Sequence, residues 1–181
     1  DIDYSKIIKN SNHYIGDIFE LLPNISADLI YFDPPYGTNN KAVTGHTRYS
    51  SIYHLWNTLV KNDRPKLFGK AGKPIETKGW TPELEQNKKE VVAPLFEKLL
   101  ELSNSKYVCL SYSNQGLLSK EEVLNAFNKA GCFNIKCYEK QHKINNQTKL
   151  AKKYGLFIDK PKDKELIEYF FIATKHYANQ K

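Results

Sequence analysis

The four consecutive residues Asp33, Pro34, Pro35 and Tyr36 carry the groups best suited to chemistry. The carboxylate of Asp33 can accept one hydrogen of an amino group, and a backbone carbonyl such as that of Pro34 can accept another. The two prolines hold these acceptors in place in advance, which is preorganisation. Tyr36 offers a flat face for a planar ring. Such a set suits reaction at an exocyclic amino group of a nucleobase, whose lone pair must be drawn out of the ring.

The residues before this motif predict the element that positions it. Residues 28–32 form a short, nearly continuous apolar run, which is typical of a strand buried on both faces. The two prolines cannot continue strand pairing, so the motif is expected at the carboxyl end of the strand, where open α/β sheets bind ligands. The competing interpretation is a strand that merely ends in a tight turn.

The remaining pattern predicts an α/β fold. Apolar periodicity indicates helices over 17–22, 91–102 and 119–130, and further strands over 106–112, 133–138 and 166–174. Ser119 and Glu122 form a capping-box pattern, and Gly131 follows as a helix stop. Two long irregular loops are expected at 37–89 and 139–164. Helices between strands favour a doubly wound, mostly parallel sheet in one domain, with an antiparallel strand near the carboxyl terminus.

Charge and composition narrow the function further. The net charge of +7 favours a polyanionic partner, although a solvated basic surface explains it equally well. Both loops are basic, and the first also contains aromatic residues, which suits a phosphate backbone. Cys109, Cys132 and Cys137 show no Cys-x-x-Cys spacing and the histidines no metal-ligand spacing, so we expect reduced thiols, no metal and a cytoplasmic location. No apolar run is long enough to cross a membrane.

The motif Asp33 to Tyr36 resembles the catalytic Asp/Asn/Ser-Pro-Pro-Tyr/Phe motif of DNA adenine N6-methyltransferases of Dam-like and restriction-modification type. The strand at 107–112 with Ser113-Asn114, and the strand at 166–174, resemble later strands of that family. The resemblance implies a Rossmann-like fold of the S-adenosylmethionine-dependent type. It also implies methyl transfer to N6 of an adenine flipped out of double-stranded DNA, with all four motif residues catalytic and Tyr36 stacking on the base.

The resemblance also implies a site for the cofactor S-adenosyl-L-methionine. Asp17, followed by Ile18, is similar to the family's acidic position beside the cofactor's adenine, and Asp33 is expected near the cofactor too. Asp17 is equally well suited to be a helix N-cap.

The family's Phe-x-Gly-x-Gly cofactor loop has no counterpart, because the nine glycines include no Gly-x-Gly. The chain also begins at Asp1 and contains no Met. We therefore expect residues 1–181 to be a partial catalytic domain, the carboxyl-terminal half of the enzyme, without the cofactor loop or the target-recognition domain. Its partners would be the missing half or a restriction enzyme. The alternatives are methylation of cytosine N4 or RNA, or a non-catalytic DNA-binding remnant.

Overall fold

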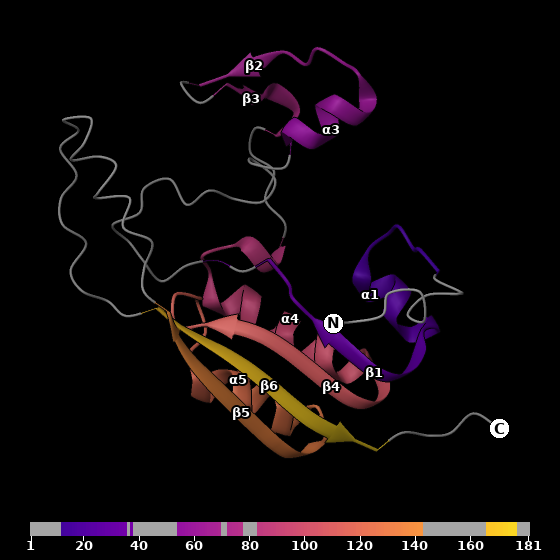
Figure 1. Ribbon diagram of the computed structural model, residues 1–181, viewed down its shortest axis with the longest axis vertical. Helices are drawn as coiled ribbons and strands as arrows, with labels where there is room; N and C mark the ends of the chain where they lie inside the picture. The colour runs from indigo at the N-terminus through magenta and orange to yellow at the C-terminus, as the bar shows by residue number, and fades with distance from the viewer. Residues whose placement is uncertain are drawn as a thin grey trace, which may run out of the picture.

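A four-stranded sheet with the strand order β1-β4-β6-β5 forms the centre of the fold (Figure 1). The computed structural model describes residues 12–35, 37, 54–69, 72–77, 83–142 and 166–176. The strands are β1 (Ser26–Phe32), β4 (Asn104–Ser113), β5 (Cys132–His142) and β6 (Leu166–Lys175). β1 runs parallel to β4, and β6 runs antiparallel to both β4 and β5. The α/β class and the late antiparallel strand are therefore confirmed.

The other elements include several that the sequence did not predict. The helices are α1 (Ile18–Leu21), α3 (His54–Lys61), α4 (Lys89–Leu102) and α5 (Lys120–Lys129), and the short turns are η2 (Leu22–Asn24), η3 (Ile75–Thr77) and η4 (Glu83–Glu85). A small hairpin pairs β2 (Leu67–Phe68) with β3 (Lys73–Pro74). The expected irregular loop at 37–89 is wrong where it contains α3 and this hairpin. The second expected loop starts too early, because β5 continues to His142; residues 143–165 lie outside the described part.

Local sequence explains the two long helices. In α5, the Ser119 hydroxyl accepts the Glu122 N–H at 3.2 Å, and the Glu122 carboxylate accepts the Ser119 N–H at 2.7 Å. This confirms the predicted capping box. Gly131 follows the helix at φ +73°, where a residue without Cβ is unstrained. α4 continues through Pro94, which lacks an N–H, and so loses one backbone hydrogen bond there.

The core lies between α4, α5 and one face of the sheet. Phe32, Val108, Leu110, Phe171 and Ala173 alternate along their strands and are buried. They pack in one cluster with buried side chains of the two helices, listed here: Val92, Phe96, Leu99, Leu100, Val123, Ala126 and Phe127. Figure 1 shows both helices behind the sheet. This packing holds the strand ends in fixed relative positions.

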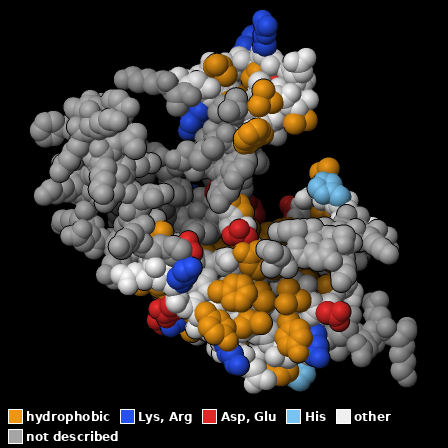
Figure 2. Space-filling model, viewed as in Figure 1, with side chains coloured by type: hydrophobic (Ala, Val, Ile, Leu, Met, Phe, Trp, Pro, Cys, Tyr) orange, Lys and Arg blue, Asp and Glu red, His pale blue; other side chains and the backbone are white. Residues whose placement is uncertain are grey.

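The opposite face of the sheet is rich in exposed apolar side chains, and we call it the open face. It is formed by Leu29, Tyr31, Tyr107, Phe133, Tyr138 and Phe170, each at least 37% exposed. Figure 2 shows hydrophobic side chains gathered over the sheet on this side. The expectation that the first strand is buried on both faces is therefore wrong for the described residues, because Leu29 and Tyr31 lie on the open face. A continuous apolar run does not reveal whether a second layer covers it.

Candidate active site

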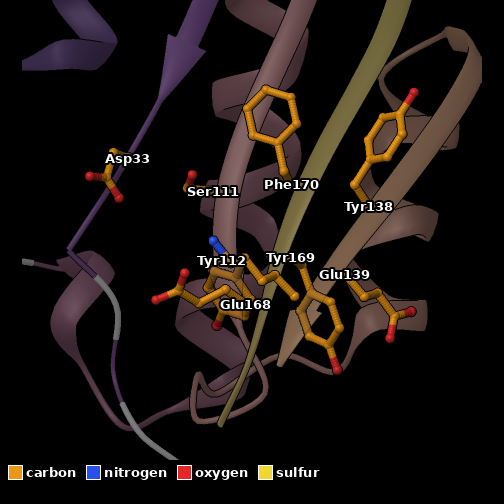
Figure 3. A pocket seen from close by; sticks show the side chains of 9 residues that line it. Asp33, Ser111, Tyr112, Tyr138, Glu139, Glu168, Tyr169 and Phe170 are labelled. Atoms are coloured by element: carbon orange, nitrogen blue, oxygen red, sulfur yellow. The ribbon is translucent and has the colours of Figure 1, made fainter. Parts of the chain in front are cut away.

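A cavity of about 450 Å³ lies where β1 and β4 end and β6 begins. Its lining comes from the residue after β1 and from β4, β5 and β6: Asp33, Ser111, Tyr112, Tyr138, Glu139, Lys140, Glu168, Tyr169 and Phe170. Because β6 and β5 are joined antiparallel, the start of β6 and the late part of β5 reach the same edge as the carboxyl ends of β1 and β4. Figure 3 shows Asp33 and Phe170 on either side of Ser111.

Of the described motif residues, Asp33 lines this cavity and the two prolines do not. Asp33 comes directly after β1 and its exposed side chain lines the cavity. Pro34 and Pro35 follow it, half-buried and outside regular secondary structure. Tyr36 lies outside the described residues, so its expected stacking role stays a prediction. The strand before the motif and the edge at which the motif lies agree with the sequence-based expectation.

Gly37 anchors the chain just after the motif. It is buried, and a Cβ atom at this position would lie 2.5 Å from the backbone oxygen of Gln86 and 2.6 Å from Oδ1 of Asn87. Only glycine permits so close an approach without movement of one of the two segments. The segment between η4 and α4 therefore lies directly against the end of the motif.

The lining combines negative charge with aromatic surface. Asp33, Glu139 and Glu168 provide three carboxylates, against the single ammonium of Lys140. The Glu139 carboxylate accepts a hydrogen bond from Lys120 outside the lining, and this bond raises the pKa of Lys120. An acidic lining of this kind attracts a cationic group more than a phosphate.

The aromatic part of the lining is held mainly by the core. The ring of Tyr112 lies edge-on to Phe96 at 5.4 Å, and its hydroxyl accepts the Leu118 N–H at 3.0 Å. Burial raises the pKa of the Tyr169 phenol above its ordinary value. The ring of Tyr112 is therefore fixed at the edge of the cavity.

Asp17 and Ile18 lie at the start of α1 and do not line the cavity. Oδ1 of Asp17 accepts the N–H of Phe19 at 2.7 Å, so Asp17 is the N-cap of this short helix. Ile18 is 37% exposed. One carboxylate oxygen of Asp17 is thus engaged in capping, and its expected contact with the cofactor stays a prediction.

Sequence reasoning missed most of the cavity. Ser111, Tyr138, Lys140 and Phe170 were not singled out, although all four line it. Their side chains share the open face with Asp33 because β4, β5 and β6 place them in register. Strict alternation within each strand would have grouped them by face, but only the strand order brings them together.

The cysteine thiols and the possible metal ligands form no second candidate site in the described part of the chain. Cys109 and Cys132 are buried and Cys137 is half-buried, and burial raises the pKa of each thiol. Within the described ranges, no three His, Cys, Asp or Glu side chains are grouped in a way that could hold a metal ion. None of the described helices is long and apolar enough to span a membrane.

Comparison with known proteins gives matches of moderate identity. The chain is 35% identical over 120 residues to the type II methyltransferase M.FokI of Planomicrobium okeanokoites, covering 62% of this chain and 16% of that protein. It is 32% identical over 122 residues to the type II methyltransferase M.NlaIII of Neisseria lactamica, covering 67% and 33%. The modification methylase StsI of Streptococcus sanguinis is 29% identical over 177 residues, covering 96% and 24%.

No protein-family model and no solved structure matches the chain. The chain spans between 16% and 34% of the length of the curated relatives that it matches. Over 62% to 96% of its length, the chain is therefore similar to one part of longer bacterial proteins described as type II methyltransferases or modification methylases.

Proposed function

We propose that this chain is the catalytic segment of a site-specific DNA methyltransferase of a bacterial restriction-modification system. The proposed reaction transfers a methyl group from S-adenosyl-L-methionine to N6 of an adenine flipped out of double-stranded DNA. The observation that carries the proposal is the place of Asp33, the first residue of the motif, in an acidic and aromatic cavity at the carboxyl edge of the sheet. The similarity to three described methyltransferases supports it.

The residues of this chain would act on the amino group of the base. The Asp33 carboxylate accepts one N–H hydrogen and the Pro34 carbonyl accepts the other, which pushes the nitrogen towards tetrahedral geometry. One amino proton must leave the nitrogen as the methyl group is added. Asp33 is exposed at the cavity and can pass this proton to water. The aromatic lining, with Tyr36 beyond the described part, would hold the ring of the base in an orientation that suits transfer.

The residues present fit the reacting end of the cofactor. S-adenosyl-L-methionine would supply an electrophilic methyl group on a positively charged sulfur, and the carboxylates of Asp33 and Glu168 suit a positive charge in the cavity. Of the residues expected near the cofactor, Asp33 lines the cavity, whereas Asp17 and Ile18 lie at α1. Asp33 is the residue through which this chain would influence both substrates.

Methyl transfer to DNA by the full-length protein tests the proposal. We expect label from methyl-tritiated S-adenosyl-L-methionine to enter DNA, and mass spectrometry of the digested DNA to show N6-methyladenine. Asp33→Ala should lower transfer by at least a hundredfold, because it removes an acceptor used in the transition state, while the Kd for DNA changes less than threefold.

Asp28→Ala is the matched control, because Asp28 is an exposed carboxylate of the same strand outside the cavity lining; its transfer should stay within twofold of wild type. Label in N4-methylcytosine would contradict the choice of adenine. Label in RNA alone would contradict the DNA substrate. Binding of DNA without any transfer would support the non-catalytic alternative.

A further inference from the structure

Two hydroxyl groups join β1 to β4 just before Asp33. Oη of Tyr31 and Oγ of Ser111 are 2.8 Å apart and share a hydrogen bond. In the strand register Tyr31 lies opposite Cys109, so its side chain reaches two residues further along β4, towards the end that holds the motif. Ser111 lines the same cavity as Asp33 (Figure 3). The hydrogen bond therefore lies at the end of the pairing between β1 and β4, next to the candidate catalytic residue Asp33.

A third strand supports this pair. The ring of Phe170 on β6 lies with its centroid 6.3 Å from that of Tyr31, at an interplanar angle of 31°. Phe170 is the register partner of Ser111. Tyr31 is 52% exposed and Phe170 is 38% exposed, so packing against Phe170 leaves part of the Tyr31 side chain in solvent. The hydrogen bond to Ser111 supplies the directional restraint that packing does not.

Asp33 lies just beyond the paired part of β1. It follows Tyr31 by two residues, so both side chains are on the same side of the extended chain. The last ladder partners of β1 and β4 are Phe32 and Leu110, which leaves Asp33 beyond the pairing. Among the described residues, none forms a hydrogen bond with the Asp33 carboxylate. Its position therefore follows from the backbone at the end of β1.

We propose that Tyr31 and Ser111 are positioning residues that hold the end of β1, and with it the Asp33 carboxylate, in the geometry needed for transfer. This inference rests on the proposed function of Asp33. Neither hydroxyl needs to touch the base. Because a displacement of the acceptor of about 1 Å is enough to slow a positioned reaction, loss of the pair should lower kcat while leaving DNA affinity unchanged.

The test compares Tyr31→Phe, Ser111→Ala and the double variant in the full-length protein. Each single variant should lower kcat about fivefold to tenfold, the range that loss of one hydrogen bond produces, with KM for DNA within twofold. The double variant should be no slower than the slower single variant, because both remove the same bond. Ser111→Thr, which keeps a hydroxyl, should recover at least half of the wild-type kcat.

A measurement independent of activity completes the test. Amide hydrogen exchange of the peptide over 28–35 should speed up about fivefold in both single variants, since the end of β1 opens more often. Tyr107→Phe is the matched control: Tyr107 is on the open face of β4 but outside the cavity lining, and its removal should change neither kcat nor this exchange.

The outcomes separate the two proposals. If Asp33→Ala abolishes transfer while Tyr31→Phe and Ser111→Ala keep wild-type kcat, the positioning role is overturned and the proposed function stands. If kcat falls only in step with the midpoint of thermal unfolding, or Ser111→Thr recovers nothing, the positioning role is also overturned. If Asp33→Ala retains transfer, the proposed function fails, and this inference fails with it.

Discussion

The lack of a Cβ atom at Gly37 allows two segments to pack closely at the end of the motif. A Cβ at this position would meet the backbone oxygen of Gln86 at 2.5 Å, a distance that forces one segment to move. We expect Gly37→Ala to lower the free energy of unfolding by about 1–3 kcal/mol, the usual cost of overpacking, and to reduce methyl transfer by more than tenfold. Calorimetry and the transfer assay measure the two effects.

Gly16→Ala is the matched control for this change, because a Cβ at Gly16 would meet nothing closer than 3.5 Å. Its stability should stay within about 0.5 kcal/mol of wild type, the usual range for a surface change. Equal stability and activity in both variants would show that the segment at Gln86 and Asn87 yields freely.

At the scale of single residues, the sequence singled out Asp33, which lines the cavity, but not the residues around it. Asp33 could be predicted because its partners in the motif are adjacent in sequence, so their spacing is independent of the fold. Ser111 and Phe170 could not, because each lies in an ordinary apolar strand. Their importance comes from their contacts with Tyr31. Ser111 shares a hydrogen bond with Tyr31 from 80 residues away in sequence, and the Phe170 ring contacts the Tyr31 ring from 139 residues away.

The capping box makes the stability of α5 depend on pH. The N–H of Ser119 lowers the pKa of the Glu122 carboxyl, and the hydrogen bond from Lys89 lowers it further. A lowered folded-state pKa means that the stabilisation is complete above the ordinary value of 4.5 and is lost as pH falls through the folded value. Glu122→Gln should therefore cost about 0.5–1 kcal/mol at pH 7, and less at pH 3.

Urea unfolding of wild type and Glu122→Gln at both pH values measures this difference. Glu90→Gln is a suitable control, since Glu90 is an exposed carboxylate in the first turn of α4 and belongs to no capping box. A cost for Glu122→Gln that stays constant from pH 7 to pH 3 would contradict a charged carboxylate as its source.

Lys175 joins the end of β6 to the end of α4. Its Nζ donates to the carbonyl oxygens of Leu100 at 2.7 Å, Glu101 at 2.6 Å and Ser103 at 3.0 Å. A cation at a helix carboxyl terminus is favoured by the helix dipole. The Leu100 carbonyl also accepts hydrogen bonds from the N–H and the hydroxyl of Ser103, so Lys175 adds to the capping of α4. Partial burial lowers the pKa of Lys175, which sets a cost against this gain.

Lys175→Met should lower the free energy of unfolding by about 1–3 kcal/mol, because it removes three hydrogen bonds to carbonyl oxygens at the end of α4. Lys136→Met, an exposed lysine on β5, is the control and should cost less than about 0.5 kcal/mol. Chemical denaturation of both variants measures the difference; equal costs would show that the carbonyls are satisfied by water instead.

At the scale of elements, sequence reasoning succeeded where signals are local. The capping box and Gly131 bound α5 correctly because both act within one helical turn. It missed α3, although the exposed apolar residues Trp56, Leu59 and Val60 recur there at helical spacing. It also failed for the faces of β1, because burial depends on which layer covers a strand, and this is a property of the whole molecule.

For the whole molecule, the open face is an exposed apolar surface that side chains of all four strands of the sheet form. We expect the purified chain to bind a hydrophobic dye and to associate at high concentration, as exposed patches of this kind do. The double variant Leu29→Thr and Phe133→Thr should reduce both effects, because it removes apolar side chains outside the cavity lining. Val60→Thr, which changes an 87% exposed residue of α3, should reduce neither.

Dye fluorescence and sedimentation velocity measure these effects. If Leu29→Thr with Phe133→Thr binds as much dye as the wild type, the dye site lies elsewhere. If it no longer binds dye but still associates, the open face is not the surface through which copies meet.

The strand order delays completion of the cavity during synthesis. β6 lies between β4 and β5, although it follows both in sequence. During synthesis β4 and β5 therefore leave the ribosome before the strand that separates them exists, and until then a direct pairing of β4 with β5 is a competing, non-native arrangement. Phe170 and Glu168 arrive with β6. The pocket around Asp33 is thus among the last features of the described fold to form, and slow translation before Leu166 would prolong the risk of misfolding.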